Sequence, residues 1–294
     1  MTNHYDFVKA NPALFKQFSC KEALFLIIDC PPGFVKAEDW IDHNCFLYVI
    51  TGNHLLFSRE RSWHISTGTT VFIKKGGLGI QKVDDHAFCA LLFYVPDSYI
   101  HSFINDKPGV VSQIDPLLVS KDMLLNVETN DVLVAFFNSV LSYFDTGQQP
   151  AEELLELKFK ELLLNIVNNP ANKELTAYLY KVYLTGTDDL KDIMERNYVY
   201  NLSLDEFARI CHRSLSKFKR DFDTVFGMPP GKWLLEKRLE YASRLLQNTK
   251  KAITEVVMES GFTNVAHFDR VFKKCFGESP LQYRKKLLAS PAYA

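Results

Sequence analysis

A residue pattern that occurs twice, 50 positions apart, limits the possible folds of this chain more than any other feature. Each copy reads Phe-x-Arg-x-Phe-x3-Phe-Gly, first over residues 218–227 and again over residues 268–277. A proline and then an aromatic residue follow both copies: Pro230 and Trp233, then Pro280 and Tyr283. Self-similarity at a fixed offset indicates that one structural unit was built twice.

Both copies predict an amphipathic helix. Phenylalanines recur at four-residue spacing and form one apolar stripe on each helix: Phe218, Phe222 and Phe226, then Phe268, Phe272 and Phe276. Polar and basic residues fall on the other faces: Ser216, Lys217, Lys219 and Arg220, then His267, Arg270, Lys273 and Lys274. Gly227 and Gly277 should end the helices, because the residue after a helix often needs a positive φ, which glycine adopts without strain.

A shorter helix and a tight turn precede each copy. Ser203 is a good N-cap for the first short helix, and Glu206 completes a capping box. In the second unit, Gly261 stands at the tight point of the turn. Helix, turn and helix with a basic outer face is the helix-turn-helix plan. We therefore predict two such motifs, at residues 203–227 and 253–277, joined by a long helix over residues 231–247. A single unit would also fit a helical bundle with a solvated charged face.

Residues 188–287 resemble the DNA-binding domain of the AraC/XylS family of bacterial transcription regulators. The second half carries the family's signature in order: Arg238-Leu239, Ala242, Leu245-Leu246, Ile253, Val256-Val257, Gly261-Phe262, Phe268, Arg270, Phe272-Lys273-Lys274, Phe276-Gly277, Ser279-Pro280 and Tyr283-Arg284. Two departures are visible. Ala266 replaces the usual small hydroxyl residue, and Asp221 and Asp223 stand where basic or neutral residues are usual. These acids would repel phosphate and weaken the first unit's grip on DNA.

The charge is divided unevenly along the chain. Residues 186–294 hold 19 basic and 14 acidic residues, a balance of +5, whereas residues 1–185 hold 15 and 21, a balance of −6. The net charge of −1 therefore conceals a basic carboxyl-terminal third. Such a division favours polyanion binding by that part alone.

Length and composition allow two domains. A chain of 294 residues that is 47% hydrophobic can bury a large core in each domain. The six cysteines show no CxxC pair, so we expect buried, reduced thiols in a cytosolic protein. The start of the chain lacks the features of a signal peptide, and the most apolar stretch, residues 132–144, is too short to span a bilayer. We expect a soluble, cytoplasmic protein with no membrane contact.

The amino-terminal part predicts a small β-barrel or jelly roll. Strand-like runs alternate with turn residues over residues 23–29, 45–50, 54–58, 70–74 and 86–95. The predicted turns are Pro31-Pro32-Gly33, Thr51-Gly52-Asn53, Thr67-Gly68 and Gly76-Gly77. This pattern resembles the cupin-like sensor domain that many AraC/XylS proteins carry. The fold class is therefore a cupin-like barrel with following helices, then an all-α domain with two helix-turn-helix motifs.

The barrel offers weak signals for a metal or an enzyme. His43, His54, His64 and His86 are candidate ligands, but no HxH with a suitably spaced glutamate is present. We therefore predict no metal, no other cofactor and no catalytic residues. Aromatic residues would line either a ligand pocket or a filled core: Phe25, Phe46, Tyr48, Phe57, Trp63, Phe72, Phe93 and Tyr94.

Residues 130–185 predict helices. The apolar stripe of residues 155–167 is wider than one packing surface requires, which favours a homodimer over purely intramolecular packing. We expect residues 183–191 to link a regulatory and dimerisation domain (residues 1–185) to a DNA-binding domain (residues 186–294).

The resemblance implies sequence-specific transcription regulation, and we expect activation with RNA polymerase as a partner. By position in the family motif, the residues that would contact double-stranded DNA are Ser216, Lys217, Lys219, Arg220, Asn264, His267, Arg270 and Lys273. A small-molecule effector acting on the amino-terminal domain is the first expectation for control. A regulatory protein without a small ligand is the alternative, followed by a metal-dependent cupin enzyme fused to the DNA-binding domain.

Overall fold

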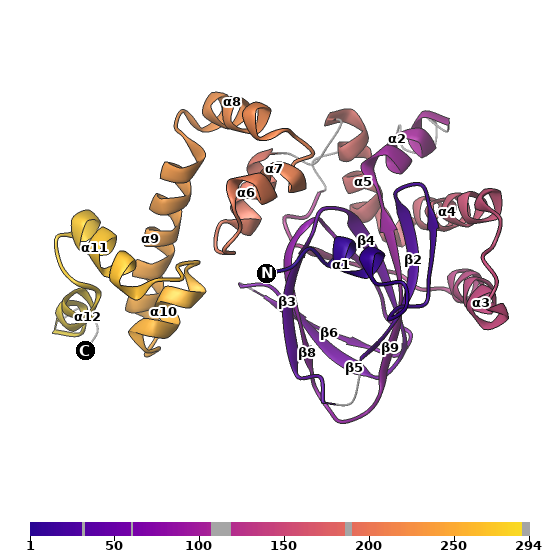
Figure 1. Ribbon diagram of the computed structural model, residues 1–294, viewed down its shortest axis with the longest axis horizontal. Coiled ribbons are helices and arrows are strands. Elements are labelled where there is room, and N and C mark those ends of the chain that lie inside the picture. Colours follow the sequence, from indigo (N-terminus) through magenta and orange to yellow (C-terminus); the bar gives the residue numbers. More distant parts are fainter. Residues whose placement is uncertain (31–32, 60, 107–118, 186–189, 290–294) are drawn as a thin grey trace. The chain divides into compact units, whose positions relative to one another are not determined.

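The computed structural model describes residues 1–30, 33–59, 61–106, 119–185 and 190–289 (Figure 1). The chain divides into two compact units, residues 1–193 with 210–212 and residues 194–209 with 213–294. Residues 183–185, expected in a linker, instead end helix α5 (Lys173–Thr185), and residues 190 and 191 begin α6 (Leu190–Asn197). The remainder of the expected linker, residues 186–189, lies outside the described residues. A domain boundary after residue 185 therefore stays a prediction.

The first unit contains two antiparallel sheets that curve around a common interior (Figure 1). The six-stranded sheet has the order β1 (Gln17–Cys20), β2 (Ala23–Cys30), β9 (Phe88–Val95), β4 (Asn44–Thr51), β7 (Thr70–Ile73) and β10 (Leu124–Val127). The four-stranded sheet has the order β3 (Lys36–Ile41), β8 (Gly76–Lys82), β5 (Asn53–Phe57) and β6 (Ser62–Ser66). The predicted barrel class is confirmed, and each of the five predicted strands overlaps an observed one.

The sequence prediction is wrong at the start of strand β8, which contains two glycines. Gly76 and Gly77 were expected in a turn, but they begin β8 and pair with Ile41 and Trp40 of β3. A third glycine of the same strand has a packing reason, since a Cβ at Gly79 would overlap the ring of Phe57. The turns at Gly52 and Gly68 are confirmed, since both have positive φ, +90° and +83°. The turn expected at Pro31-Pro32 lies outside the described residues.

The six-stranded sheet is buried on both faces. Most of the aromatic residues expected inside the barrel lie on its outer face, under three helices: α3 (Asp131–Thr146), α4 (Glu152–Val167) and α5. Phe25 contacts Phe159 of α4 at a ring distance of 4.4 Å, and Tyr48 stacks on Phe137 of α3 at 4.1 Å. The inner face is mainly aliphatic. Strand alternation cannot distinguish two buried faces, so the expected position in the interior is wrong for the five aromatic residues of the outer cluster, whereas Tyr94 belongs to the inner cluster and Trp63 packs against it.

Two shorter helices complete the first unit. Helix α1 (His4–Ala10) packs on β3, and α2 (Asp97–Asp106) packs on α5. The helices predicted within residues 130–185 are confirmed as α3, α4 and α5. None of the helices in the described part of the chain is both long enough and apolar enough to cross a lipid bilayer.

The second unit is helical, as predicted. After α6 it contains α7 (Leu204–Ile210), α8 (Leu215–Phe226), α9 (Pro230–Asn248), α10 (Ile253–Glu259), α11 (Val265–Phe276) and α12 (Pro280–Ala289). Helices α7 and α8 form the first predicted helix-turn-helix, and α10 and α11 form the second. Phe268 and Phe272 of α11 are fully buried against Leu239 and Leu246 of the joining helix α9. All six cysteines are free. Cys20, Cys45 and Cys211 are buried, as expected, but Cys30 and Cys89 are only half-buried and Cys275 is exposed.

Candidate nucleic-acid interface and barrel cavity

Helices α8 and α11 begin and end in the same way. The Oγ of Ser214 accepts a hydrogen bond from the amide of Lys217 at 3.3 Å, and the Oδ1 of Asn264 accepts one from the amide of His267 at 2.8 Å. Side-chain caps of this kind fix the first turn of a helix. At the other ends, Gly227 and Gly277 adopt φ of +67° and +80°, as the repeat predicts. The sequence repeat is therefore also a structural repeat.

The predicted contact residues share one property, which is exposure to solvent. This holds for all eight: Ser216, Lys217, Lys219, Arg220, Asn264, His267, Arg270 and Lys273. On the opposite faces of the same helices, Phe218, Phe222, Phe268 and Phe272 are completely buried. The buried stripe fixes the rotation of each helix, so the polar face has to point away from its own unit.

Ion pairs compensate one of the two unusual acids in the first motif. The Oδ2 of Asp221 lies 2.9 Å from the Nε of Arg213, and its Oδ1 lies 3.8 Å from the Nε of Arg220. Arg213 and Asp221 are both largely buried side chains, and the pair joins the turn to α8. The repulsion of phosphate expected from Asp221 is thereby reduced, whereas Asp223 is exposed. Sequence reasoning missed this pair because the two residues are eight positions apart and separated by a turn.

The second motif links two of its predicted contact residues to each other. The Nη2 of Arg270 lies 3.2 Å from the Nδ1 of His267, one helical turn away. An imidazole nitrogen that accepts this hydrogen bond holds the guanidinium over the first half of α11. Asn264 has a second role that the sequence analysis did not assign: its side-chain oxygen Oδ1 caps the helix. The side-chain nitrogen Nδ2 of Asn264 can still donate a hydrogen bond to DNA.

Arg238 of α9 holds the chain in front of the first motif. Its Nε and Nη2 donate hydrogen bonds to the carbonyl oxygens of Tyr198 and Tyr200, both at 2.7 Å. Burial lowers the pKa of Arg238 to about 10. Gly261, in the turn of the second motif, lies against the same segment, since a Cβ there would stand 2.6 Å from the carbonyl oxygen of Val199. The family signature contains Arg238, but the sequence alone gave it no role.

A cavity of about 340 Å³ lies inside the barrel of the first unit. Aliphatic side chains from both sheets form much of its wall, among them Leu47, Leu56, Leu78 and Ile80. A pocket of this size and character is typical of small-molecule sites. The filled core, which was the favoured expectation over a ligand pocket, therefore does not describe the barrel interior.

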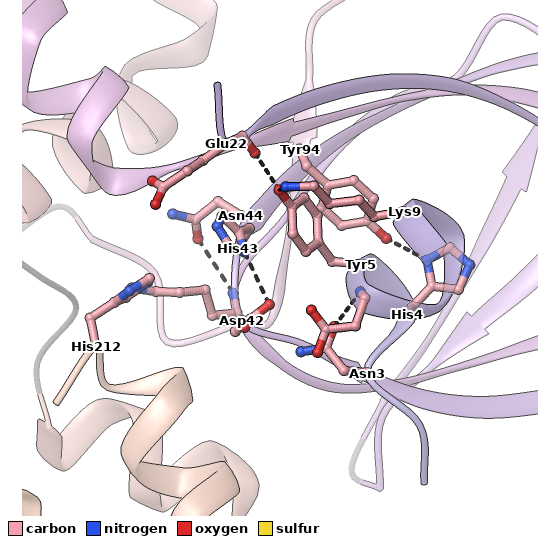
Figure 2. A network of polar contacts seen from close by, with 12 residues as sticks. Asn3, His4, Tyr5, Lys9, Glu22, Asp42, His43, Asn44, Tyr94 and His212 are labelled. Carbon is pink, nitrogen blue, oxygen red and sulfur yellow. Dashed lines mark hydrogen bonds and ion pairs between the residues drawn. The ribbon is translucent and has the colours of Figure 1, made fainter. Parts of the chain in front are cut away.

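Helix α1 contributes polar groups to one side of the cavity. Figure 2 shows the Nδ1 of His4 hydrogen-bonded to the hydroxyl of Tyr94, with Tyr5 beside them. Tyr5 packs edge-on against Tyr94 at a ring distance of 5.3 Å and donates its hydroxyl hydrogen to the carbonyl oxygen of Glu22 at 2.7 Å. Burial lowers the pKa of His4, and the carboxylate of Asp39 opposes this effect. The cavity is therefore lined by a neutral imidazole at neutral pH.

The four histidines considered as metal ligands do not assemble a site in the described residues. The only group of three candidate ligands there is Cys20, Glu152 and Glu156. The Nδ1 of His54 is hydrogen-bonded to the carbonyl oxygen of Asn53 at 2.6 Å, and burial lowers the pKa of His54. Burial also raises the pKa of the Cys20 thiol, which disfavours the thiolate that a metal would need.

Comparisons with known proteins match both parts of the chain. The family model described as "ExsA N-terminal regulatory domain" matches residues 44–178. A second model, described as "Helix-turn-helix domain", matches residues 207–286 and so includes both repeats except the start of α7. The two models together span most of the chain from β4 to α12.

Three curated relatives carry the names of transcription regulators. The chain is 26% identical to the virulence regulon transcriptional activator VirF of Yersinia enterocolitica over 246 residues, which covers 81% of this chain and 90% of VirF. It is 31% identical to the HTH-type transcriptional regulator ExsA of Pseudomonas aeruginosa over 129 residues, 44% of this chain and 46% of ExsA. It is 34% identical to an uncharacterized HTH-type transcriptional regulator of Haemophilus influenzae over 218 residues, covering 71% and 66%.

Proposed function

Because the chain belongs to the AraC/XylS family of DNA-binding transcription regulators, we propose that it activates transcription by reading two successive major grooves of an operator. The observation that carries this proposal is the structural duplication: α8 and α11 have the same caps, the same buried stripe and the same exposed polar face. VirF, a relative over most of the chain, is named a transcriptional activator. Activation implies RNA polymerase as a partner in the cytoplasm, where the DNA is.

Eight exposed side chains would divide the work of recognition. Ser216, Lys219 and Arg220 would contact bases or nearby phosphates in one groove, and Asn264, His267 and Arg270 in the next, while Lys217 and Lys273 would bind phosphates. Arg270 has the fork of donors that fits the O6 and N7 of guanine, and its contact with His267 would orient that fork. Two reading helices on one chain predict two half-elements of direct-repeat character, about 34 Å apart.

Control by a small effector is the form of regulation that the first unit supports best. The barrel holds a cavity of about 340 Å³ with an apolar wall and few polar groups. A regulatory protein that binds the first unit is the competing proposal. Heat stabilisation of the purified protein by a small molecule would favour the effector, and stabilisation only by a protein fraction would favour the alternative.

We also propose that the first unit forms a homodimer. Val132 of α3 and Leu154 and Leu157 of α4 are apolar and exposed, with Leu157 at 60% exposure. Exposed leucines on a packed helix favour burial in a second interface. Sedimentation of the full chain and of the Leu157→Glu variant would test this proposal, because a monomeric wild-type protein would contradict it.

Selection of random duplex DNA by the purified full-length protein tests the proposed function. The selection should be run at two salt concentrations, because phosphate contacts weaken as salt rises. We expect an enriched motif of two half-elements about one helical turn apart. A motif with a single half-element would limit recognition to one helix-turn-helix. Binding without any enriched motif would contradict sequence-specific regulation by the free protein.

A further inference from the structure

The wall of the barrel cavity has an uneven charge. Among the described residues that line it are two carboxylates, Asp29 and Asp39, and neither a lysine nor an arginine. Asp29 is exposed to solvent, so its charge is screened. Asp39 is half-buried, and its field therefore acts more strongly on whatever occupies the cavity.

Asp39 stands on the cavity face of β3. Ala37, Asp39 and Ile41 alternate along this strand and all line the cavity, and Asp39 pairs in register with Leu78 of β8. The carboxylate makes no hydrogen bond or ion pair with the side chains that the structure describes. Lys36 of β3 and Arg59, which follows β5, both bind Glu38 on the other face of the strand, at 3.1 and 2.9 Å.

The other titratable groups around the cavity do not supply a positive charge. His4 is half-buried, is bonded to the Tyr94 hydroxyl, and is neutral at neutral pH because desolvation lowers its pKa. Lys82 follows Ile80 on the same face of β8, but its Nζ is bonded to Asp85 at 3.1 Å and it does not line this cavity. The cavity is therefore an apolar space with a net negative wall.

We propose that the barrel cavity binds an apolar organic cation, an amine with an aromatic or aliphatic body, whose ammonium group pairs with Asp39. The body of the ligand would lie against Leu47, Leu56 and Ile80, where burial of apolar surface supplies most of the affinity. The ring of Tyr94 borders the same space and can face a cation. An organic anion of the same shape would meet two carboxylates and no cation, so it should bind much more weakly.

This inference rests on the proposed function only in taking the cavity as the effector site. Calorimetric titration of the full-length protein tests it with three probes of nearly equal shape: naphthalen-2-ylmethylamine, naphthalen-2-ylmethanol and naphthalene-2-carboxylate. We expect the amine to bind at least about tenfold more tightly than the carboxylate, since one buried charge pair is enough for such a ratio. The alcohol should lie between them.

Two substitutions on β3 separate the ammonium contact from general effects. Asp39→Asn keeps the shape of the side chain and should remove the advantage of the amine over the alcohol. Glu38→Gln, on the neighbouring residue and the opposite face, should leave the order of the three probes unchanged. The ranking of the probes on the wild-type protein stands as an independent test if Asp39→Asn does not fold.

Three outcomes would overturn the inference. These are a carboxylate that binds as well as the amine, an amine preference that survives Asp39→Asn, and failure of all three probes to bind at millimolar concentration. The DNA selection described above is measured separately. An enriched operator without binding of any probe would refute the ligand and leave the DNA-binding function, whereas amine binding without an operator would do the reverse.

Discussion

The Nε of Arg238 lies 2.7 Å from the carbonyl oxygen of Tyr198 and donates a hydrogen bond to it. A second bond of the same length reaches Tyr200 from Nη2. One side chain of α9 therefore satisfies two backbone carbonyls of the segment that leads into the first helix-turn-helix. Since α9 also packs against α10, the guanidinium ties that segment to the core of the second motif.

Replacement of Arg238 by methionine should destabilise the second unit. Methionine keeps the apolar stem but leaves the carbonyls of Tyr198 and Tyr200 without their donors, at a cost of about 2–3 kcal/mol. Urea unfolding of the full-length protein measures the change. Lys232→Met, on the exposed side of the same helix, should change the free energy of unfolding by less than about 0.5 kcal/mol, because the ion pair of Lys232 with Glu236 at 3.8 Å is exposed to solvent. Equal effects of the two substitutions would refute the role assigned to Arg238.

Gly261→Ala should cost more stability than the same substitution at Gly277. Both glycines have positive φ, +83° and +80°, so each alanine pays about 1–2 kcal/mol for the left-handed backbone. At Gly261 the new Cβ would also stand 2.6 Å from the carbonyl oxygen of Val199 and 2.9 Å from the Nε of Arg238, whereas nothing lies within 4 Å at Gly277. Thermal unfolding of the two variants gives the comparison. A larger loss at Gly277 would contradict the close packing at Gly261.

The all-α part was predictable almost residue by residue. Its helices are amphipathic, their stripes repeat, and their ends carry local signals such as the Ser203–Glu206 capping box, which is present with bonds of 2.7 and 3.2 Å. The eight candidate contact residues followed from their positions in the family motif. Pairs across a turn, such as Arg213 with Asp221, could not be predicted, because their distance depends on the turn's geometry.

The sequence predicted the fold class of the barrel, but it did not predict which side chains face the barrel interior. Both faces of the six-stranded sheet are covered, so residues such as Phe25 and Phe93 are buried whichever way they point. Strand β8 begins with two glycines, which predict a turn when read locally, because its pairing with β3 is a long-range property. Asp39 was not singled out, since its position on the cavity face depends on the register of β3.

Arg270→Ala should weaken operator binding by about 1–3 kcal/mol and relax the preference for one base pair. Arginine offers two parallel donors to guanine, and alanine offers none. Arg220→Ala should act in the same way on the other half-element. Titration of operators that differ at single positions measures both effects. If Arg270→Ala left both affinity and preference unchanged, the second reading helix would be wrongly assigned.

Lys273→Ala should weaken all DNA sequences alike. Its exposed ammonium group is placed to bind phosphate, which positions the protein without specifying bases. The slope of log affinity against log salt should fall by about one unit. Binding to the operator and to an unrelated duplex, each at several salt concentrations, tests this prediction. A loss confined to the operator would instead indicate a base contact.

Acid should destabilise the first unit through two histidines whose pKa is lowered in the folded chain, His4 and His54. Burial lowers the pKa of His4 and His54 below their ordinary value of 6.5, against the opposing fields of Asp39 and Asp84. Below pH 6.5 the unfolded chain therefore binds more protons than the folded chain, so the free energy of unfolding is greatest above pH 6.5 and falls as the pH drops through it. Urea unfolding at several pH values between about 7.5 and 5 measures this slope.

His4→Gln and His54→Gln should each flatten that slope, because glutamine does not titrate in this range. Both substitutions will also lower stability at every pH, since hydrogen bonds to Tyr94 and to the carbonyl oxygen of Asn53 are weakened, so the slope and not the absolute value is the readout. His64→Gln on β6 is the matched control, because the His64 side chain is exposed. Wild-type slopes in both buried-site variants would mean that these two histidines are not the source of the acid sensitivity.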